Sequence, residues 1–306
     1  MFDKILKALS LFFFLFGAYM IYKEVSLVGL STLITSLKKT SLFLLISGLI
    51  LTLINFLFLA GYDFLGLQYL KRKLPFLTVF KISALSFAIS NVAGHTYASG
   101  SALRYLLLKK FEFQKKEIFI LVGFISLLSV FGLMIGFLLA LFVKILGAIP
   151  VHFLHPFLFY LTGATCLLIF LFYFFKIVPN KRELKIKNIR LKAPSFSLSA
   201  KGIFIGLMDF LSLYSVFYLF LASNGDFHLL FVFPAFAFAL VLAYLSQVPA
   251  GIGVFESLFL ILYPHESDEK AIILTAFILF RVVYYIIPFC LAGIYLLIQK
   301  PNRENF

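Results

Sequence analysis

Five ionisable residues lie within or close to long apolar segments of this chain: Asp63, Arg104, Asp209, Glu256 and Arg281. A charged side chain at the centre of a bilayer costs about 2.5–3.5 kcal/mol on insertion scales, so such groups pair with one another or face water. Three acids against two arginines leave the set at −1, which favours a cationic or zwitterionic group in a polar cavity. The alternative is structural: Arg281 pairs with Glu256 or Asp209 and fixes the packing, and Asp63 lies at a helix end near the interface.

Small and polar residues interrupt one apolar segment between Asn91 and Ser101. The interruption contains Gly94, Ser99 and Gly100, with Arg104 just beyond. A helix that begins near Ser99 to Ser101 would offer free backbone N–H groups to an anion. Arg104 would add a planar, two-pronged donor suited to phosphate. The alternative for Arg104 is that its side chain extends to the membrane interface.

A second apolar segment is interrupted between Ser246 and Glu256. Proline removes a backbone donor and glycine loosens a helix, so a break at membrane depth needs protein or water around it and usually lines a cavity. Gln247 would supply uncharged hydrogen bonds, and Glu256 either serves the cavity or caps a short helix. The glycines and the proline expected to form this break are Pro249, Gly251 and Gly253.

The composition identifies a polytopic membrane protein. Of the 306 residues, 62% are hydrophobic and 13% are charged, whereas soluble domains carry about 25% charged residues. The net charge of +14 reflects basic clusters in short loops, as the positive-inside rule expects, and predicts no nucleic-acid partner. His152 and His155 lack a third ligand at motif spacing, so we expect neither a metal nor a cofactor. With no catalytic motif in the chain, we do not expect an enzyme.

We predict an all-α polytopic membrane protein with six full spans and two re-entrant helical hairpins. The spans are expected at 5–22, 41–62, 117–143, 157–176, 202–222 and 271–298. The hairpins are expected at 76–108 and 229–263. The longest polar stretch, 177–200, is expected to be only a loop.

The charges of the loops set the expected orientation. Basic clusters at both ends of 76–108 make it an inner hairpin, and outer loops on both sides of 229–263 make it an outer hairpin. A single transmembrane domain, 1–306, then divides into half-repeats 1–156 and 157–306 of opposite topology, a plan of many secondary transporters. Loop 23–40 is a misfit, since it is expected outside yet is basic. Asp63-Phe-Leu-Gly-Leu and Asp209-Phe-Leu-Ser-Leu form a weak internal repeat that supports the two halves.

Several short motifs follow one another in an order found in a known family. They are Tyr62-Asp63, Ser90-Asn91 with Gly94, Ser99-Gly100 with Arg104-Tyr105, Ser246-Gln247-Val248-Pro249 through Gly251 and Gly253 to Glu256, and Phe280-Arg281 with Tyr284-Tyr285 and Pro288. In these the chain resembles, over about residues 10–298, the transmembrane flippase region of bacterial lysylphosphatidylglycerol synthetase/flippase proteins and their stand-alone relatives. Two departures are Ala250, where the family often has a second glycine, and Leu106, where a further arginine is common.

The resemblance implies a multi-pass protein of the bacterial cytoplasmic (inner) membrane that transfers an aminoacylated phospholipid to the outer leaflet and so gives resistance to cationic antimicrobial peptides. Full-length members carry a soluble synthetase domain, so lipid synthesis is not expected of this chain, and a separate aminoacyl-lipid synthetase is a candidate partner. A homo-oligomer is compatible with the sequence. Leu106 argues against a lysyl headgroup in particular.

Phosphate binding by Arg104, and attraction of a headgroup amine by Asp63, Asp209 or Glu256, are the expected roles in a phospholipid flippase. Two other classes stay open: an accessory subunit or membrane-embedded enzyme of lipid modification, and a secondary transporter of a small solute. New lipid species would favour the enzyme, and substrate-dependent ion flux would favour the solute transporter.

Overall fold

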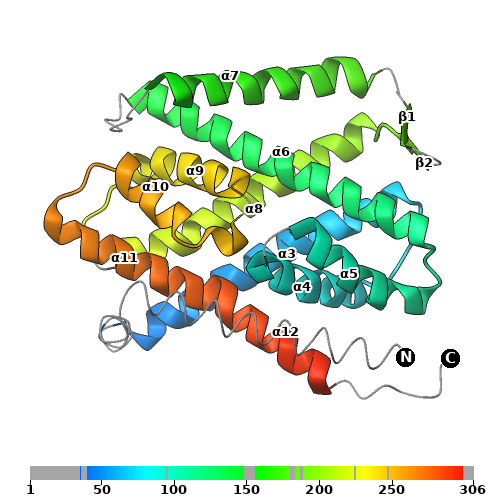
Figure 1. Ribbon diagram of the computed structural model, residues 1–306, viewed down its shortest axis with the longest axis horizontal. Coiled ribbons are helices and arrows are strands. Elements are labelled where there is room, and N and C mark those ends of the chain that lie inside the picture. Colours follow the sequence, from blue (N-terminus) through cyan, green and yellow to red (C-terminus); the bar gives the residue numbers. More distant parts are fainter. Residues whose placement is uncertain are drawn as a thin grey trace.

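The structure is a computed structural model that describes residues 35, 40–93, 96–147, 156–179, 183–186, 189–223, 225–246 and 248–298. These residues form an elongated bundle of helices (Figure 1). The predicted span 5–22, together with Gly94 and Gln247, lies outside the described residues.

Five helices are long and apolar enough to cross a membrane. They are α3 (Leu42–Tyr69), α6 (Lys115–Gly147), α7 (Pro156–Phe172) with its π-helical extension η2 (Tyr173–Ile177), α8 (Phe196–Ala222), and the continuous unit of α11 (Ser267–Arg281), η4 (Val282–Ile286) and α12 (Ile287–Ile298). Five of the six predicted spans coincide with these helices, although the limits of the helices differ from the predicted ones. α3 continues past 62, because the carboxylate of Asp63 is paired inside the bundle and does not have to end the helix. α8 begins before 202, where Ser195 caps it by accepting from the amide of Leu198 at 3.3 Å.

Each of the two interrupted segments forms a pair of helices that pack against each other. The first pair is α4 (Phe76–Ala93) and α5 (Thr96–Leu108), which ends in the short 3-10 helix η1 (Lys109–Phe111). The second pair is α9 (Leu229–Leu245) and α10 (Val254–Leu262), joined through the 3-10 turn η3 (Pro249–Gly251). Figure 1 shows the two pairs in opposite halves of the long axis. The turn η3 contacts α4, so the second break meets the first pair near the middle of the molecule.

The polar stretch 177–200, expected to be only a loop, contains a small antiparallel ribbon. β1 (Glu183–Ile186) pairs with β2 (Ile189–Lys192), with Glu183 opposite Lys192. The sequence Glu-Leu-Lys-Ile alternates polar and apolar residues with a period of two, which is typical of a strand and not of a helix. The described chain is therefore helical apart from this ribbon.

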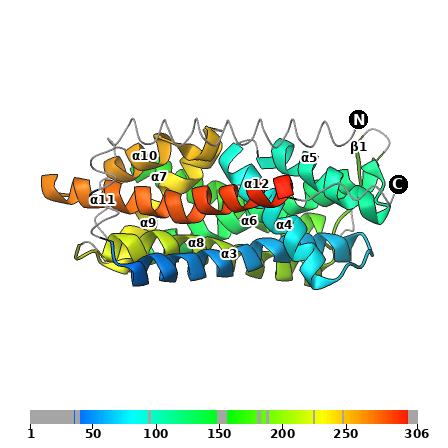
Figure 2. The same cartoon turned by 90° about the horizontal axis from the view of Figure 1, so that it is seen from below.

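Helices α3, α6 and α8 form the centre of the bundle, and α3 lies beside α8 along its length (Figure 2). Two glycines bring α6 and α8 together: a Cβ added at Gly206 would lie 2.5 Å from the Cα of Gly132, a separation that no side chain can occupy. The hydroxyl of Tyr62 fills the adjoining space, 2.8 Å from a Cβ placed at Gly132. Close backbone approach at small residues is common between helices in membranes.

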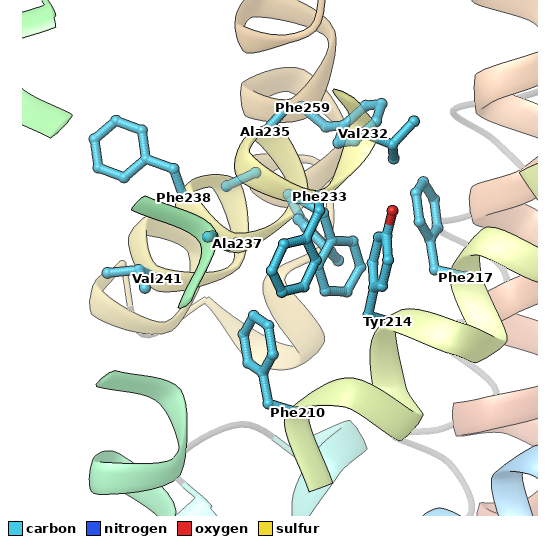
Figure 3. Close-up of a cluster of buried hydrophobic side chains, with 14 of the residues drawn as sticks. Phe210, Tyr214, Phe217, Val232, Phe233, Ala235, Ala237, Phe238, Val241 and Phe259 are labelled. Atoms are coloured by element: carbon cyan, nitrogen blue, oxygen red, sulfur yellow. The ribbon is translucent and has the colours of Figure 1, made fainter. Parts of the chain in front are cut away.

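Aromatic side chains fix the second helix pair to the bundle (Figure 3). The ring of Phe217 on α8 lies with its centroid 5.3 Å from that of Phe259 on α10, and the ring of Tyr214 lies 4.8 Å from that of Phe233 on α9. The hydroxyl of Tyr214 also donates to the carbonyl of Leu229 at 2.5 Å. Such tilted and edge-on pairs add about 0.5–1.5 kcal/mol each beyond the burial of their area. The α9–α10 pair is therefore held by rigid packing and not by loops alone.

Candidate functional site

Asp63 on α3 and Arg104 on α5 form a fully buried ion pair. Nε of Arg104 donates to Oδ1 of Asp63 at 2.8 Å, and Nη2 donates to Oδ2 at 2.8 Å. Both side chains are 3% exposed, and the guanidinium lies 4.6 Å from the ring centroid of Phe87. Gly100 packs closely beside it, since a Cβ there would lie 3.1 Å from Nη1 of Arg104 and 3.2 Å from Cβ of Ser90. This bidentate pair joins the first helix pair to α3, and it occupies two of the four groups expected to meet a headgroup.

Arg281 on α11 pairs with Glu256 on α10, as the structural alternative allowed. Nε donates to Oε1 of Glu256 at 2.6 Å, and Nη2 contacts the same oxygen. Nη1 donates to the carbonyl of Ala250 at 3.0 Å, inside the second break. The other oxygen of Glu256 accepts from the amide of Gly253 at 2.9 Å, so Glu256 also caps α10. Arg281 and Glu256 thus hold the break in shape from two sides.

The break depends on three consecutive or near-consecutive residues with positive φ. Gly251 and Gly253 have φ values of 64° and 79°, and Ala250 has φ 51°. An L-residue in the left-handed region costs about 1–2 kcal/mol, which glycine avoids. The geometry therefore explains why glycine suits position 250, where this chain carries alanine.

Asp209 on α8 has no cationic partner among the described residues. Its carboxylate accepts from Nδ2 of Asn55 at 2.8 Å and from the hydroxyl of Tyr62 at 2.9 Å. Asn55 is fully buried, and its own amide oxygen accepts from the hydroxyl of Tyr284 at 2.8 Å. The excess negative charge counted in the sequence is therefore located at Asp209, in a network of uncharged donors.

Asp209 lines a cavity of about 210 Å³ between the two helix pairs. Asn91, near the first break, and Val248, Ala250 and Gly251, at the second, also line it. The remaining wall is largely aromatic and aliphatic, formed by Leu59, Phe87, Ser129, Leu133, Phe210, Leu213, Leu240, Ala243, Tyr244, Phe255, Tyr284 and Tyr285. A carboxylate surrounded by aromatic rings provides both charge and cation–π attraction for a small cation.

The structure brings some of the sequence-predicted site residues together and separates others. Asn91 and Asp209 line the cavity, whereas Asp63, Arg104, Glu256 and Arg281 are engaged in ion pairs beside it. The side chains of Ser99 and Pro249 lie outside the described part of the chain, as do Gly94 and Gln247. The helix expected to begin near Ser99 to Ser101 begins at Thr96, so Ser101 lies in its second turn and does not offer a free amide there.

Three residues of the Asp209 network were missing from the predicted site: Asn55, Tyr62 and Tyr284. Tyr62 and Tyr284 stand in the motifs that carry the family resemblance, and the helix that holds Asn55 and Tyr62 offered a further signal. Asn55 and Tyr62 are seven residues apart on one helix and therefore share a face, which Asp63 adjoins. A buried asparagine in an otherwise apolar span is as informative as a charge, because its amide must be satisfied inside the protein.

The sequence matches the family described as "Lysylphosphatidylglycerol synthase TM region" over residues 4–292. The chain belongs to this family. The match covers nearly the whole polypeptide, including both helix pairs and the cavity. It confirms the resemblance drawn from the motifs and supports a multi-pass membrane protein.

Individual relatives agree with this assignment. The chain is 31% identical over 246 residues to the uncharacterized protein slr0712 of Synechocystis sp., covering 78% of this chain and 74% of that one. It is 26% identical over 266 residues to the inner membrane protein YbhN of Escherichia coli, covering 85% and 81%. It is 24% identical over 259 residues to the phosphatidylglycerol lysyltransferase of Bacillus subtilis, covering 84% of this chain but 29% of that protein.

Proposed function

We propose that this protein moves a phospholipid between the leaflets of the bacterial inner membrane, with the headgroup passing through the central cavity. The observation that carries the proposal is the carboxylate of Asp209, which faces the cavity with only uncharged partners among the described residues. Asp209 is half-buried, and a charge withdrawn from bulk water without a counter-ion is costly unless a ligand or water completes its surroundings. The ammonium group of a zwitterionic or aminoacylated headgroup would provide that counter-ion.

The helix pairs suit alternating access to such a cavity. On the charge pattern of the loops, α4–α5 is a re-entrant hairpin that enters from the cytoplasm and α9–α10 one that enters from outside. Their breaks meet at the cavity, since Asn91 and Gly251 both line it. This is the inverted-topology plan, in which one repeat moves against the other around a fixed midplane site.

The size of the cavity limits what can enter it. Pockets that bury a drug-sized molecule measure about 300–1,000 Å³, and this one measures about 210 Å³. It can enclose a small headgroup but not acyl chains, which would remain in the bilayer. The name of the Bacillus subtilis relative makes an aminoacylated phosphatidylglycerol one substrate to test. A phosphate-binding role for Arg104 would require its ion pair with Asp63 to open during transport.

The test is leaflet exchange in liposomes that contain the purified protein and a labelled phospholipid. We expect Asp209→Asn to lower exchange of a lipid with an ammonium headgroup by about tenfold, the effect of losing a charge-assisted hydrogen bond. Exchange of a lipid without an ammonium should change much less. The matched control is Asp226→Asn, an exposed acid in the loop before α9, which should leave both rates unchanged. Equal rates for wild type and Asp209→Asn would remove the cavity from the mechanism.

A secondary transporter of a small solute is the second candidate, because a cavity of about 210 Å³ also fits a small organic cation. The two candidate functions differ in the process that the protein would carry out, which is ion-coupled solute transport in one case and lipid exchange between leaflets in the other. Substrate-dependent proton or sodium flux in liposomes of unlabelled lipid, without leaflet exchange, would select the solute transporter.

A further inference from the structure

A second cavity lies on the flank of the molecule, between α3, α4 and α12. Its volume is about 330 Å³, larger than the central cavity. α4 packs against both α3 and α12, so all three helices form its walls. Its lining is Leu49, Thr52, Leu53, Phe56, Phe80, Lys81, Ala84, Leu85, Ala88, Ile287, Pro288, Leu291, Ala292 and Tyr295. We call this cavity the flank groove.

Local helix chemistry explains why space remains there. Pro288 has no amide hydrogen for the helix ladder, and the wide π-helical turn η4 (Val282–Ile286) ends two residues before it. Ala84, Ala88 and Ala292 are small, so the facing surfaces of α4 and α12 leave the groove unfilled. The contact between Phe56 and Tyr284, with ring centroids 6.3 Å apart, lies between the flank groove and the central cavity.

Two polar groups face this otherwise apolar groove. Lys81 is exposed, and no acidic residue lines the groove among the described residues. Thr52 is 3% exposed, and its hydroxyl has no hydrogen-bond partner in the described part of the chain. That hydroxyl has almost no accessible surface, so Lys81 is the polar group of the groove that a ligand can reach.

The position of Lys81 along α4 suits the boundary between headgroups and acyl chains. It follows the first residue of α4, Phe76, by five residues, or about 7.5 Å of helix. The basic cluster Lys71-Arg72-Lys73 precedes this helix and marks the cytoplasmic side. The long lysine side chain can then reach the level of the lipid phosphates.

We propose that the flank groove binds an anionic phospholipid of the inner leaflet. Its phosphate pairs with the ammonium of Lys81, and an acyl chain lies along Leu53, Ala84 and Leu291. The argument for a lipid is charge complementarity at one end of an apolar groove that opens on the flank of a membrane-spanning bundle. This site is distinct from the central cavity and stands whether or not the protein moves lipids.

The experiment uses the purified full chain in nanodiscs with a tracer lipid that carries a photoactivatable group on an acyl chain. One sample contains phosphatidylglycerol and the other phosphatidylcholine with the same chains. Labelled peptides are located by mass spectrometry. We expect phosphatidylglycerol to label α3 near Leu53, α4 near Ala84 and α12 near Leu291 more strongly than phosphatidylcholine does.

Two variants and a control make the test specific. Lys81→Ala should lower phosphatidylglycerol labelling about fivefold, the factor expected for one interfacial lysine, and leave phosphatidylcholine labelling unchanged. Ala84→Phe, which fills the groove, should lower the labelling by both lipids. Lys201→Ala removes an equally exposed lysine from the first turns of α8 and should change neither.

Three outcomes would overturn the proposal. The first is equal labelling of these helices by the two lipids in the wild type. The second is an equal effect of Lys81→Ala and Lys201→Ala. The third is that Ala84→p-benzoylphenylalanine cross-links to residues 5–22 and not to lipid, because that segment of the chain would then fill the groove.

Discussion

Two arginines are buried in the described part of the chain, and they form ion pairs of different character. Arg104 and Asp63 are each 3% exposed and bind each other through two parallel hydrogen bonds. Arg281 and Glu256 are 5% and 13% exposed, and each also binds a backbone group of the second break. The first pair joins two helices, whereas the second shapes a turn that lines the central cavity.

The two ion pairs therefore have different structural roles, although their arginines and acids look equivalent in the sequence. Among the residues that the structure describes, the charged atoms of Arg104 and Asp63 hydrogen-bond only to each other, so this pair contributes to helix packing and its loss should affect the whole fold. Arg281 and Glu256 also bind backbone groups of the second break, so this pair controls the local geometry there and its loss should affect the cavity first. Asp209 belongs to neither pair and lies in the lining of the central cavity with uncharged hydrogen-bond partners.

The largest effect is expected from Arg104→Ala. This change leaves the carboxylate of Asp63 buried without its partner, which typically costs about 3–5 kcal/mol. Thermal unfolding in detergent should show a large fall in the midpoint. The double variant Asp63→Leu/Arg104→Leu should recover most of the loss, because it leaves no unpaired charge.

A surface pair provides the control for this prediction. Arg72 and Glu117 lie 3.4 Å apart with side chains 35% and 26% exposed. Glu117→Gln should cost less than about 1 kcal/mol. Equal losses for Glu117→Gln and Arg104→Ala would contradict the role given to the buried pair.

Arg281→Ala should destabilise the protein by about 2–3 kcal/mol, the range for hydrogen bonds to charged groups left unmade. The distinctive result is local. Hydrogen exchange should accelerate in the peptide that contains η3 and the start of α10, since the carbonyl of Ala250 and the carboxylate of Glu256 both lose a donor. In Arg104→Ala the same peptide should keep its protection relative to the rest of the fold. If both variants open it alike, the two pairs do not differ as described.

Glu256→Gln should cost less, about 1–2 kcal/mol. Glutamine keeps an oxygen for the amide of Gly253, and Arg281 keeps the carbonyl of Ala250, but the charge attraction is lost. The exchange rate at the second break should lie between those of the wild type and Arg281→Ala. Glu256→Leu removes the cap as well and should match or exceed Arg281→Ala.

The smallest effect is expected from Ala250→Gly, which should raise the unfolding midpoint slightly. Glycine removes a left-handed penalty of about 1–2 kcal/mol at φ 51° and gives back about 0.4–1 kcal/mol through the entropy of the unfolded chain. Ala243→Gly, on the regular helix α9, is the control and should destabilise instead. A lower midpoint for Ala250→Gly would mean that the strain at the second break is relieved in another way.

Much of the helical plan could be predicted because it depends on local sequence. The limits of both helix pairs, 76–108 and 229–263, agree with the structure to within one residue, since polar and charged residues bound both apolar segments. The start of α8 was missed because a serine cap extends a helix beyond its apolar part. The ribbon in 177–200 was missed because a short alternating stretch is hidden among many lysines.

The sequence by itself determined that the chain is a membrane bundle, where its helices break, and that its embedded charges sum to −1. Hydrophobicity, proline, glycine and charge act over one or two helical turns, so their effects can be read along the chain. Only the tertiary structure decided that Arg104 pairs with Asp63, that Arg281 pairs with Glu256, and that Asp209 lines the cavity without a cationic partner among the described residues. Those choices depend on which helices lie side by side, because an ion pair forms over a few ångströms of space between residues that are 41 and 25 positions apart in the sequence.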